Sequence, residues 1–367
     1  MADPAADPLA AQAEAVILVG GQGSRLRPLT LTTPKPMLPC AGVPFLTHQL
    51  LRLAETGIEH VVLATSYRAE VFAEHYGDGG ELGLAIDYVT ETEPLGTGGG
   101  IRNVADRLTG GPDTPVVILN GDVLSGHDLT AQLRMHREVD AAVTLHLVGV
   151  EDPRAFGCVP TEADGRVTAF LEKTPEPVTD QINAGCYIFR RDVLETIPTG
   201  RPVSVERETF PGLLAAGSRV QGYREDAYWL DVGTPAAFVR GSADLVRGVL
   251  RSPAVAAPGP ALIAPDALVA EDAQVGDGSV IGPGCVISAG AVISGSVLFE
   301  NVWVAAGAEV RSSVLGAGAR VGERSALTDA VLGDQSLVGN DNELAAGARL
   351  WASAVLPDAT IRFSPGA

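Results

Sequence analysis

Lysine is rare in this chain, and its two lysines are candidate phosphate ligands. Of its 26 basic residues only Lys35 and Lys173 are lysines, and both lie in proline-flanked loops, TPKP at residues 33–36 and EKTP at residues 172–175. A lysine ammonium is a compact point charge on a flexible stem, and the planar fork of arginine cannot replace it at every site. We therefore interpret both as phosphate-handling residues. The alternative is that both are ordinary surface lysines with no role in phosphate binding.

A glycine-rich loop follows the first apolar run. Residues 20–30 read GGQGSRLRPLT, and residues 20–39 carry Arg25, Arg27 and Lys35 without any acidic residue. Glycines let backbone N–H groups approach a triphosphate closely, and Arg25 and Lys35 would neutralise a leaving pyrophosphate. The loop is neither a Walker A motif nor a dinucleotide-binding G-x-G-x-x-G fingerprint. It predicts a polyphosphate site of another kind, with a plain turn as the alternative.

Two aspartates are candidate metal ligands. Asp122 follows the apolar run at residues 116–119, and Asp231 follows a Trp-Leu pair. Mg²⁺ prefers carboxylate oxygens, and a metal held by two of them can bridge substrate phosphates. Asp122 and Asp231 together predict a magnesium site, whereas either alone is more often a turn or cap residue.

Alternating strand and helix patterns must position these residues. Short apolar runs, typical of buried parallel strands, lie at residues 16–19, 61–63, 116–119 and 143–145. Helical patterns lie between them, at residues 45–55 and 129–137. Residues 158–172 resemble a hairpin that turns at 163–165. The alternation predicts a doubly wound, Rossmann-like α/β domain over residues 14–252, with ligand loops at the carboxyl ends of its strands.

A different repeat follows an Ala/Pro/Gly-rich linker at residues 253–265. Apolar residues recur every six positions from Ile263 to Ile293, and a small-Val-Leu/Ile triplet recurs every seventeen residues from Ser279 to Leu332. This periodicity predicts a left-handed parallel β-helix of hexapeptide repeats, with about five coils, over residues 266–367. Its terminal coils would expose backbone edges, so we expect a homo-oligomer assembled through this domain.

Charge and composition disfavour several partners and locations. The net charge of −19 disfavours nucleic acid and anionic membranes. No apolar run approaches the roughly 18 residues of a membrane span. Residues 1–13 lack a basic start before an apolar stretch, which predicts a disordered tail rather than a signal peptide. Four cysteines without metal-type spacing predict reduced thiols in a cytoplasmic protein: Cys40, Cys158, Cys186 and Cys285.

The glycine-rich loop and the motifs after it resemble the sugar-1-phosphate nucleotidyltransferases. In that family's order the chain carries EPLGTGG at residues 93–99, NGD at 120–122, FGCV at 156–159, EK at 172–173, NAG at 183–185, VERE at 205–208 and WLDVG at 229–233. With its repeat tail it most resembles the two-domain members that are mannose-1-phosphate guanylyltransferases. Two positions depart from the pattern: Ser24 stands where threonine is common, and Thr174 separates Lys173 from Pro175.

The resemblance implies Mg²⁺-dependent transfer of a nucleotidyl group from GTP to mannose 1-phosphate, with release of pyrophosphate. Arg25 and Lys35 would act on the leaving group, and Lys173 on the entering phosphate. Nucleotide binding would involve Leu18, Gly20, Gly21, Gly23, Ser24, Glu93, Pro94, Gly96, Thr97, Asn120, Gly121 and Asp122. Sugar binding would involve Gly157, Glu172, Asn183 and Asp231, and the metal would lie on Asp122 and Asp231.

The choice of base can be argued from hydrogen bonding. Guanine offers two adjacent donors, N1–H and the N2 amine, which one carboxylate can accept together. Residues 91–96 supply Glu91 and Glu93, so we expect GTP. One alternative is that both glutamates are simply solvated. The other is that the substrate is a uridine, thymidine or adenine nucleotide, used with glucose 1-phosphate.

Two further functions are less well supported. A hexapeptide-repeat acyltransferase generally needs a histidine base, yet all six histidines precede the linker: His48, His60, His75, His127, His136 and His146. A non-catalytic paralogue that senses sugar nucleotides is the other alternative. The joint presence of Arg25, Lys35, Asp122, Lys173 and Asp231 favours activity.

Overall fold

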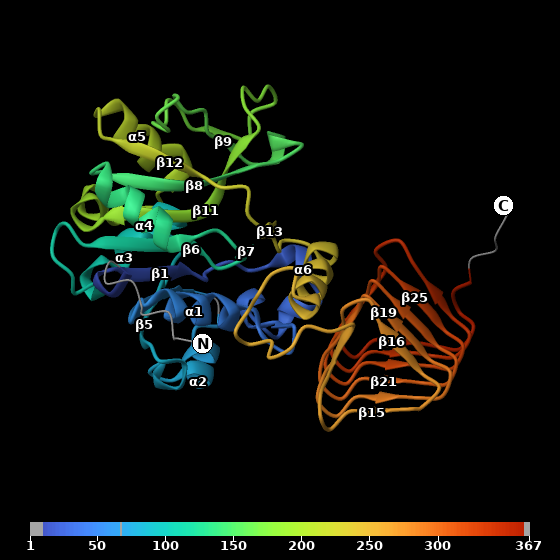
Figure 1. The fold of residues 1–367 in the computed structure, drawn as a ribbon. Coiled ribbons are helices and arrows are strands. Elements are labelled where there is room, and N and C mark those ends of the chain that lie inside the picture. Colours follow the sequence, from blue (N-terminus) through green and yellow to red (C-terminus); the bar gives the residue numbers. More distant parts are fainter. Residues whose placement is uncertain (1–9, 67, 363–367) are drawn as a thin grey trace. The chain divides into compact units, whose positions relative to one another are not determined.

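The computed structural model describes residues 10–66 and 68–362 (Figure 1). The chain forms two compact units: unit 1 holds residues 1–21 and 49–229, and unit 2 holds residues 22–48 and 230–367. Of the tail expected to be disordered, residues 1–9 lie outside the described residues. Ala10–Gln12 form a 3-10 turn (η1) in which Ala10 is buried.

Unit 1 contains a nine-stranded mixed sheet. Strands β5 (Ala85–Thr90), β4 (His60–Thr65), β1 (Glu14–Leu18) and β6 (Pro115–Asn120) lie in this order and run parallel. The long strand β11 (Gln181–Arg190) then runs antiparallel to β6. It also pairs with β8 (Val143–Gly149), which runs parallel to β12 (Val220–Arg224). The α/β fold predicted from the alternation is confirmed.

The sequence analysis missed β11, which separates β8 from β6. Its apolar run is interrupted by Asn183, Ala184 and Gly185, and the register with β8 shifts between Asn183 and Tyr187, as at a β-bulge. The predicted hairpin is confirmed. β9 (Gly157–Cys158) pairs antiparallel with β10 (Leu171–Glu172), and the chain turns between Glu162 and Gly165, which has a φ of 81°.

Six α-helices lie within the described residues. α1 (Phe45–Thr56) and α4 (Leu129–Glu138) confirm the two predicted helices. Asp128 caps α4 by accepting from the backbone N–H of Ala131. The other α-helices are α2 (Glu70–Tyr76), α3 (Gly96–Asn103), α5 (Phe210–Ala215) and α6 (Pro235–Arg247). Shorter turns are η2 (Ser24–Leu26), η3 (Leu29–Leu31), η4 (Lys35–Met37), η5 (Gly80–Leu82), η6 (Ala105–Arg107), η7 (Pro153–Ala155), η8 (Arg191–Thr196) and the π-helical η9 (Val205–Thr209).

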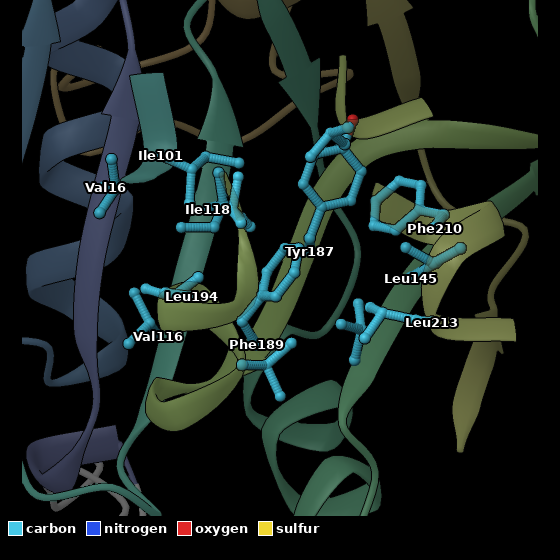
Figure 2. Close-up of a cluster of buried hydrophobic side chains, with 14 of the residues drawn as sticks. Val16, Ile101, Val116, Ile118, Leu145, Tyr187, Phe189, Leu194, Phe210 and Leu213 are labelled. Carbon is cyan, nitrogen blue, oxygen red and sulfur yellow. The ribbon is translucent and has the colours of Figure 1, made fainter. Parts of the chain in front are cut away.

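The core of unit 1 lies against the central strands. Figure 2 shows aliphatic side chains of β1, β6 and β8 beside the aromatic rings of β11 and α5. The ring centroids of Tyr187 and Phe210 are 5.2 Å apart in an edge-to-face arrangement, and those of Phe189 and Phe210 are 6.1 Å apart. These fully buried rings fix β11 against its neighbours, because aromatic pairs add to the free energy of burial.

At the amino ends of the parallel strands, His60 bridges two carboxylates. Its Nδ1 donates to Glu14 Oε1 over 2.7 Å, and its Nε2 donates to Asp87 Oδ2 over 3.2 Å. Burial would raise the pKa of Glu14, but hydrogen bonds from His60, Thr109 and Gly110 lower that pKa to about 2. The hydrogen bond to Glu14 raises the pKa of His60 despite its partial burial.

We expect the change His60→Gln to destabilise the protein more at pH 6 than at pH 9. A raised pKa in the folded state stabilises the protein fully below the unfolded value of about 6.5, and this stabilisation is lost as pH rises through the folded pKa. Urea midpoints at both pH values should show a loss of roughly 1–2 kcal/mol at pH 6. His75→Gln, at an exposed histidine, is the control. An equal loss at both pH values would contradict the prediction.

Unit 2 contains a parallel β-helix, as the repeat predicted. Three parallel sheets run along it, and one strand of each contributes to every full coil (Figure 1). The first sheet comprises β14 (Ala261–Ile263), β17 (Ser279–Ile281), β20 (Val297–Leu298), β23 (Val314–Leu315), β26 (Val331–Leu332) and β29 (Arg349–Leu350). The second comprises β15 (Leu268–Val269), β18 (Val286–Ile287), β21 (Trp303–Val304), β24 (Arg320–Val321), β27 (Leu337–Val338) and β30 (Val355–Leu356). The third comprises β16 (Gln274–Gly276), β19 (Val292–Ser294), β22 (Glu309–Arg311), β25 (Ala326–Thr328) and β28 (Glu343–Leu344).

The first sheet of the β-helix is covered by other parts of unit 2. Its outward valines, such as Val297 and Val314, are buried. Helix α6 packs beside it, with the rings of Phe238 and Phe299 6.4 Å apart. Thr32 donates to Asp334 over 2.8 Å. β14 begins inside the stretch expected to be a linker. The remaining short strands are β2 (Pro39–Cys40), β3 (Val43–Pro44), β7 (Val123–Ser125) and β13 (Trp229–Asp231).

Two expectations from composition can be compared with the structure. The four cysteines are buried free thiols, as predicted, and burial raises the pKa of Cys40 and Cys186 to about 12. Within residues 10–66 and 68–362, no helix has the length and apolar character needed to cross a bilayer.

Candidate functional site

In unit 1, several predicted site residues meet where β1 and β6 end. The N–H of Gly121 donates to Leu18 O over 3.0 Å. A methyl group at Gly121 would lie 2.6 Å from Leu18 O, so only glycine fits this crossing. Asn120 and the partly exposed Asp122 flank Gly121, and Gly20 and Gly21 continue β1 at exposed positions. The carboxyl ends of adjacent parallel strands thus bring these residues together, as is usual for ligand sites in such sheets.

Gln49 supports this loop from α1. Its Nε2 donates to Asn120 O over 2.9 Å and to Val123 O over 3.0 Å, so the amide holds both sides of the Gly121–Asp122 pair. Its Oε1 is buried and has no hydrogen-bond partner within the described part of the chain. An amide that leaves its own oxygen unsatisfied in order to bind two carbonyls is a candidate positioning group, because such burial costs free energy.

We expect the change Gln49→Met to raise the Mg²⁺ concentration needed for half-maximal turnover and to lower kcat by about 10-fold, as loss of outer-shell support does. The reason is that Asn120 and Val123 would lose the donors that fix the Asp122 loop. Gln221→Met is the matched control, since Gln221 is also buried and donates to Asp164 O in the hairpin turn. Both should lose roughly 1–3 kcal/mol of stability. An unchanged Mg²⁺ dependence in Gln49→Met would refute this role.

The loop after β5 holds the predicted base-reading residues. Glu91 Oε2 accepts from the N–H of Leu95 over 3.3 Å, and Glu91 Oε1 would lie 2.8 Å from a methyl group at Gly100. Burial raises the pKa of Glu91. Glu91 therefore braces its own loop against α3, whereas Glu93 and Pro94 are exposed. The structure thus gives the two glutamates different surroundings, although the sequence analysis considered both for base recognition.

The glycine-rich start of α3 is engaged by the protein itself. The N–H groups of Gly98 and Gly99 donate to Val203 O, and a methyl group at Gly96 would lie 2.7 Å from the same oxygen. The hydroxyl of Thr97 donates to Glu206 over 2.9 Å and accepts from the N–H of Val205. Thr97 therefore has no hydroxyl proton left to donate to a nucleotide.

Two further groups of predicted residues lie along β9, β10 and β11. A methyl group at Gly157 would lie 2.7 Å from the buried ring of Phe170 and 2.9 Å from Glu172 Oε2, so glycine makes room first for that ring and then for the carboxylate. Lys173 adopts a left-handed φ of 50°, and its Nζ lies 3.7 Å from Glu172 Oε1. Its side chain is 62% exposed, so the ammonium can reach a bound phosphate.

Asn183 is tied to Asn120 through Tyr187. Asn183 Nδ2 donates to the hydroxyl of Tyr187 over 2.9 Å, and Tyr187 also hydrogen-bonds Asn120. Burial raises the pKa of Tyr187, which keeps its hydroxyl protonated. Asn183 Oδ1 accepts from the N–H of Gly185, which has a φ of 76°. Asn183 therefore stabilises the turn at Gly185 and is also connected to Asn120 through Tyr187.

In unit 2, the glycine-rich loop brings Gly23 and Lys35 together. A methyl group at Gly23 would lie 2.9 Å from Lys35 Cβ and 3.0 Å from Thr30 Cγ2, and Gly23 itself has a φ of 58°. Thr30 donates to Gly23 O over 2.9 Å. Ser24 and Arg25 are exposed on the following 3-10 turn. This packing fixes the stem of Lys35 and leaves the loop's polar groups at the surface.

The side chains of Arg25 and Asp231 both lie close to Gly233. A methyl group at Gly233 would lie 2.5 Å from Arg25 Nη2 and 3.0 Å from Asp231 Oδ1. The glycine of the WLDVG motif thus makes room for one predicted catalytic cation and one predicted metal ligand. The sequence analysis gave Gly233 no role, although its place in that motif was a signal.

The predicted aspartates fit the ligand chemistry of Mg²⁺. Among residues 10–66 and 68–362, no group of three or more His, Cys, Asp or Glu side chains is placed to hold a metal ion. Mg²⁺ usually keeps several waters and is held by one or two carboxylates together with substrate phosphates. Asp122 in unit 1 and Asp231 in unit 2 are each a partly exposed carboxylate, which is the ligand type that Mg²⁺ accepts.

The sequence analysis also missed Gln49, Glu206 and Tyr187. Gln49 is a polar residue within an otherwise apolar helix face that includes Leu46, Leu50 and Leu53, which was a usable signal. Glu206 belongs to the recognised VERE motif but was given no role. Nothing in the sequence marks Tyr187 as more than a core residue.

Comparisons with known proteins agree with this geometry. The Nucleotidyl transferase family matches residues 14–248, and the GMPPB C-terminal domain matches residues 257–364. The chain is 56% identical over 355 residues to a mannose-1-phosphate guanylyltransferase of Mycobacterium tuberculosis, covering 96% of this chain and 98% of that protein.

A second relative and a solved structure each match somewhat less than two thirds of the chain. The mannose-1-phosphate guanylyltransferase catalytic subunit beta of Drosophila pseudoobscura pseudoobscura is 40% identical over 228 residues, covering 62% of this chain and 61% of that protein. The crystal structure of HddC from Yersinia pseudotuberculosis superimposes with a TM-score of 0.55 at 27% identity, covering 63% of this chain and 99% of that one.

Proposed function

Because the chain belongs to the nucleotidyl transferase family, we propose that it converts GTP and mannose 1-phosphate into GDP-mannose and pyrophosphate. The observation that carries this proposal is the 56% identity, over 96% of the chain, to a protein named for that activity. The predicted nucleotide residues Leu18, Asn120, Gly121 and Asp122 gather at the ends of β1 and β6, which supports it independently.

The reaction is an in-line displacement at the α-phosphorus of GTP. A phosphate oxygen of mannose 1-phosphate forms the new bond to that phosphorus, and the bond to the bridging oxygen of the β-phosphate breaks, so pyrophosphate leaves with the electron pair. The attacking phosphate is already anionic near pH 7, and no general base is needed. The protein's task is therefore to position the substrates and neutralise charge.

Each cation has a distinct place in this proposal. Arg25 and Lys35 neutralise the charge that grows on the leaving pyrophosphate, and the exposed loop glycines Gly20 and Gly21 allow close backbone approach. Lys173 binds the entering phosphate, within reach because its side chain is largely exposed. Asp122 and Asp231 would hold Mg²⁺, which when bound polarises the phosphoryl oxygens.

The substrates' other groups are assigned to the remaining residues. Glu93, exposed after β5, would accept the N1–H and N2 hydrogens of guanine. Glu172 and Asn183 would hydrogen-bond the sugar hydroxyls, with Gly157 beside them. Ser24, Gly23, Pro94, Gly96 and Thr97 complete the nucleotide site. Thr97 would contribute through its backbone, since its hydroxyl proton is bound to Glu206.

The organisation of the chain fits this activity. We propose that residues 14–252 are catalytic, that residues 253–265 link them to the β-helix of residues 266–367, and that the protein works as a homo-oligomer. Four reduced thiols support a reducing compartment such as the cytoplasm.

A substrate panel tests the proposal. Pyrophosphate release would be measured with GTP, UTP, dTTP and ATP, each with mannose 1-phosphate and glucose 1-phosphate, in the presence of Mg²⁺. The GTP and mannose 1-phosphate pair should give the highest kcat/KM. A preference for another nucleotide would overturn the guanine assignment, and no release with any pair would restore the non-catalytic alternative.

A further inference from the structure

The glycine-rich loop belongs to the same compact unit as the β-helix. Unit 2 joins residues 22–48 to residues 230–367, although the two stretches lie far apart in the sequence. Both proposed leaving-group cations, Arg25 and Lys35, lie in the first of these stretches. The contacts that hold this stretch within unit 2 therefore decide where the two cations lie.

Two hydrogen bonds connect this stretch to the β-helix. Arg349 Nη1 donates to Arg27 O over 2.6 Å. Thr32 Oγ1 donates to Asp334 Oδ2 over 2.8 Å. In the sequence, Arg27 comes shortly after one cation and Thr32 shortly before the other, so the β-helix holds the chain at two points between them. We call residues 27–32 the clamped segment.

The two β-helix partners are themselves fixed. Asp334 Oδ1 accepts from the N–H of Ala317 over 3.0 Å, so this carboxylate binds the neighbouring coil and Thr32 at once. Arg349 begins β29, which pairs in parallel with β26, and the next residue, Leu350, packs against the β-helix interior. Groups that stand on regular strands define a position more precisely than groups on a loop.

The clamped segment is packed together with the loop around it. Leu26 and Leu29 are fully buried. Thr30 donates to Gly23 O over 2.9 Å, and a methyl group at Gly23 would lie 2.9 Å from Lys35 Cβ. Because these contacts connect the segment to the glycine-rich loop and to the stem of the lysine, a shift of the segment would move both cations.

The far end of the stretch is held by contacts of a different kind. The N–H of Ala41 donates to Ser242 Oγ of α6 over 2.9 Å, and His48 Nδ1 lies 2.6 Å from Ser252 Oγ. Ser242, His48 and Ser252 are buried, so changing them would damage the core. The two bonds to the clamped segment lie at the surface instead, and each can be removed without opening a cavity.

We propose that Arg349 and Asp334 are positioning residues for the transfer reaction. By holding the clamped segment, they keep Arg25 and Lys35 in the arrangement that binds the β- and γ-phosphates of the nucleotide, the group that leaves as pyrophosphate. Cations that are already in place bind more tightly, because less conformational freedom is lost on binding. The inference rests on the roles proposed above for these two cations, and it gives the β-helix a part in nucleotide binding.

Binding of GTP and of GMP to the full chain tests the proposal, by isothermal titration calorimetry in Mg²⁺ without mannose 1-phosphate. GMP lacks the β- and γ-phosphates, so the ratio of the two Kd values reports on the leaving-group cations. Thr32→Val removes the donor to Asp334 without a change of charge, and Arg349→Met removes the donor to Arg27 O. Each should weaken GTP binding by about 5–10-fold, the net effect of one hydrogen bond, and leave the Kd of GMP within about 2-fold.

Two controls separate position from charge. Arg349→Lys retains a cationic donor for Arg27 O and should recover most of the GTP affinity. Arg320→Met removes the same charge from the first position of another β-helix strand, β24, where Arg320 lies over the Trp303 ring. It should bind GTP like the wild type. Melting followed by circular dichroism would verify that every variant is folded.

The remaining outcomes count against the inference and show where it fails. GTP binding that is normal in Thr32→Val, alone or together with Arg349→Met, would overturn the clamp and leave the proposed function intact. Equal weakening of GTP and GMP would show general damage in place of positioning. A wild type that binds GTP no more tightly than GMP would contradict the roles of Arg25 and Lys35 themselves. If the substrate panel favours another base, its triphosphate and monophosphate replace GTP and GMP.

Discussion

Replacing Lys173 by methionine should lower kcat by about 10²–10³-fold, the effect of removing one preorganised group that stabilises charge in the transition state. The ammonium would contact the entering phosphate, and methionine retains the length of the stem without its charge. Because the Lys173 side chain is 62% exposed, the change leaves no cavity, and the melting temperature should stay within about 1 °C of the wild type.

Two controls separate charge from geometry at this position. Lys173→Arg retains the positive charge but replaces a point charge by a planar fork, so it should recover only part of the activity. Arg154→Met removes an exposed cation from a neighbouring turn, where it pairs with Asp152, and should leave kcat unchanged. Near-normal turnover of Lys173→Met would refute the proposed role.

The change Asp122→Asn should lower kcat by about 10³-fold at fixed Mg²⁺, equivalent to about 4 kcal/mol of lost transition-state stabilisation. Asparagine fits the same partly exposed position but carries no charge to hold a divalent ion. The required Mg²⁺ concentration should rise, and Mn²⁺ binding in the presence of GTP, followed by the electron paramagnetic resonance signal of the free ion, should weaken in parallel.

Asp128→Asn is the matched control for this change. Asp128 lies six residues further along the same unit and caps α4 through the N–H of Ala131, a role that asparagine fills equally well. This variant should match the wild type in turnover, Mg²⁺ requirement and Mn²⁺ binding. If Asp122→Asn also binds Mn²⁺ like the wild type, the metal is held elsewhere.

The sequence was sufficient for features that depend on neighbouring residues. The hexapeptide period from Ile263 to Ile293 predicted a parallel β-helix, because each coil repeats the same local geometry. The short apolar runs and the helical patterns of α1 and α4 likewise followed from residues close together in the sequence. The order of motifs from residue 20 to residue 233 predicted the family.

Features that depend on distant residues required the structure. Strand β11 was missed because Asn183 and Gly185 interrupt its apolar run at a bulge, and its place between β6 and β8 is set by pairing across the sheet. Glu91 and Glu93 are equivalent in the sequence, and only the contacts with Leu95 and Gly100 show that Glu91 braces the loop.

For this protein, the sequence by itself determined which chemical groups are available. It also determined the strand and helix pattern of the α/β domain and the repeat period of the β-helix, because these are properties of residue type and spacing. Only the tertiary structure decided which groups support one another. Gln49 reaches the carbonyls around Asp122, and Glu206 accepts a hydrogen bond from the hydroxyl of Thr97, 109 residues earlier in the chain. The physical reason is that such contacts are made by side chains that folding brings together from distant parts of the chain, and no local pattern encodes them.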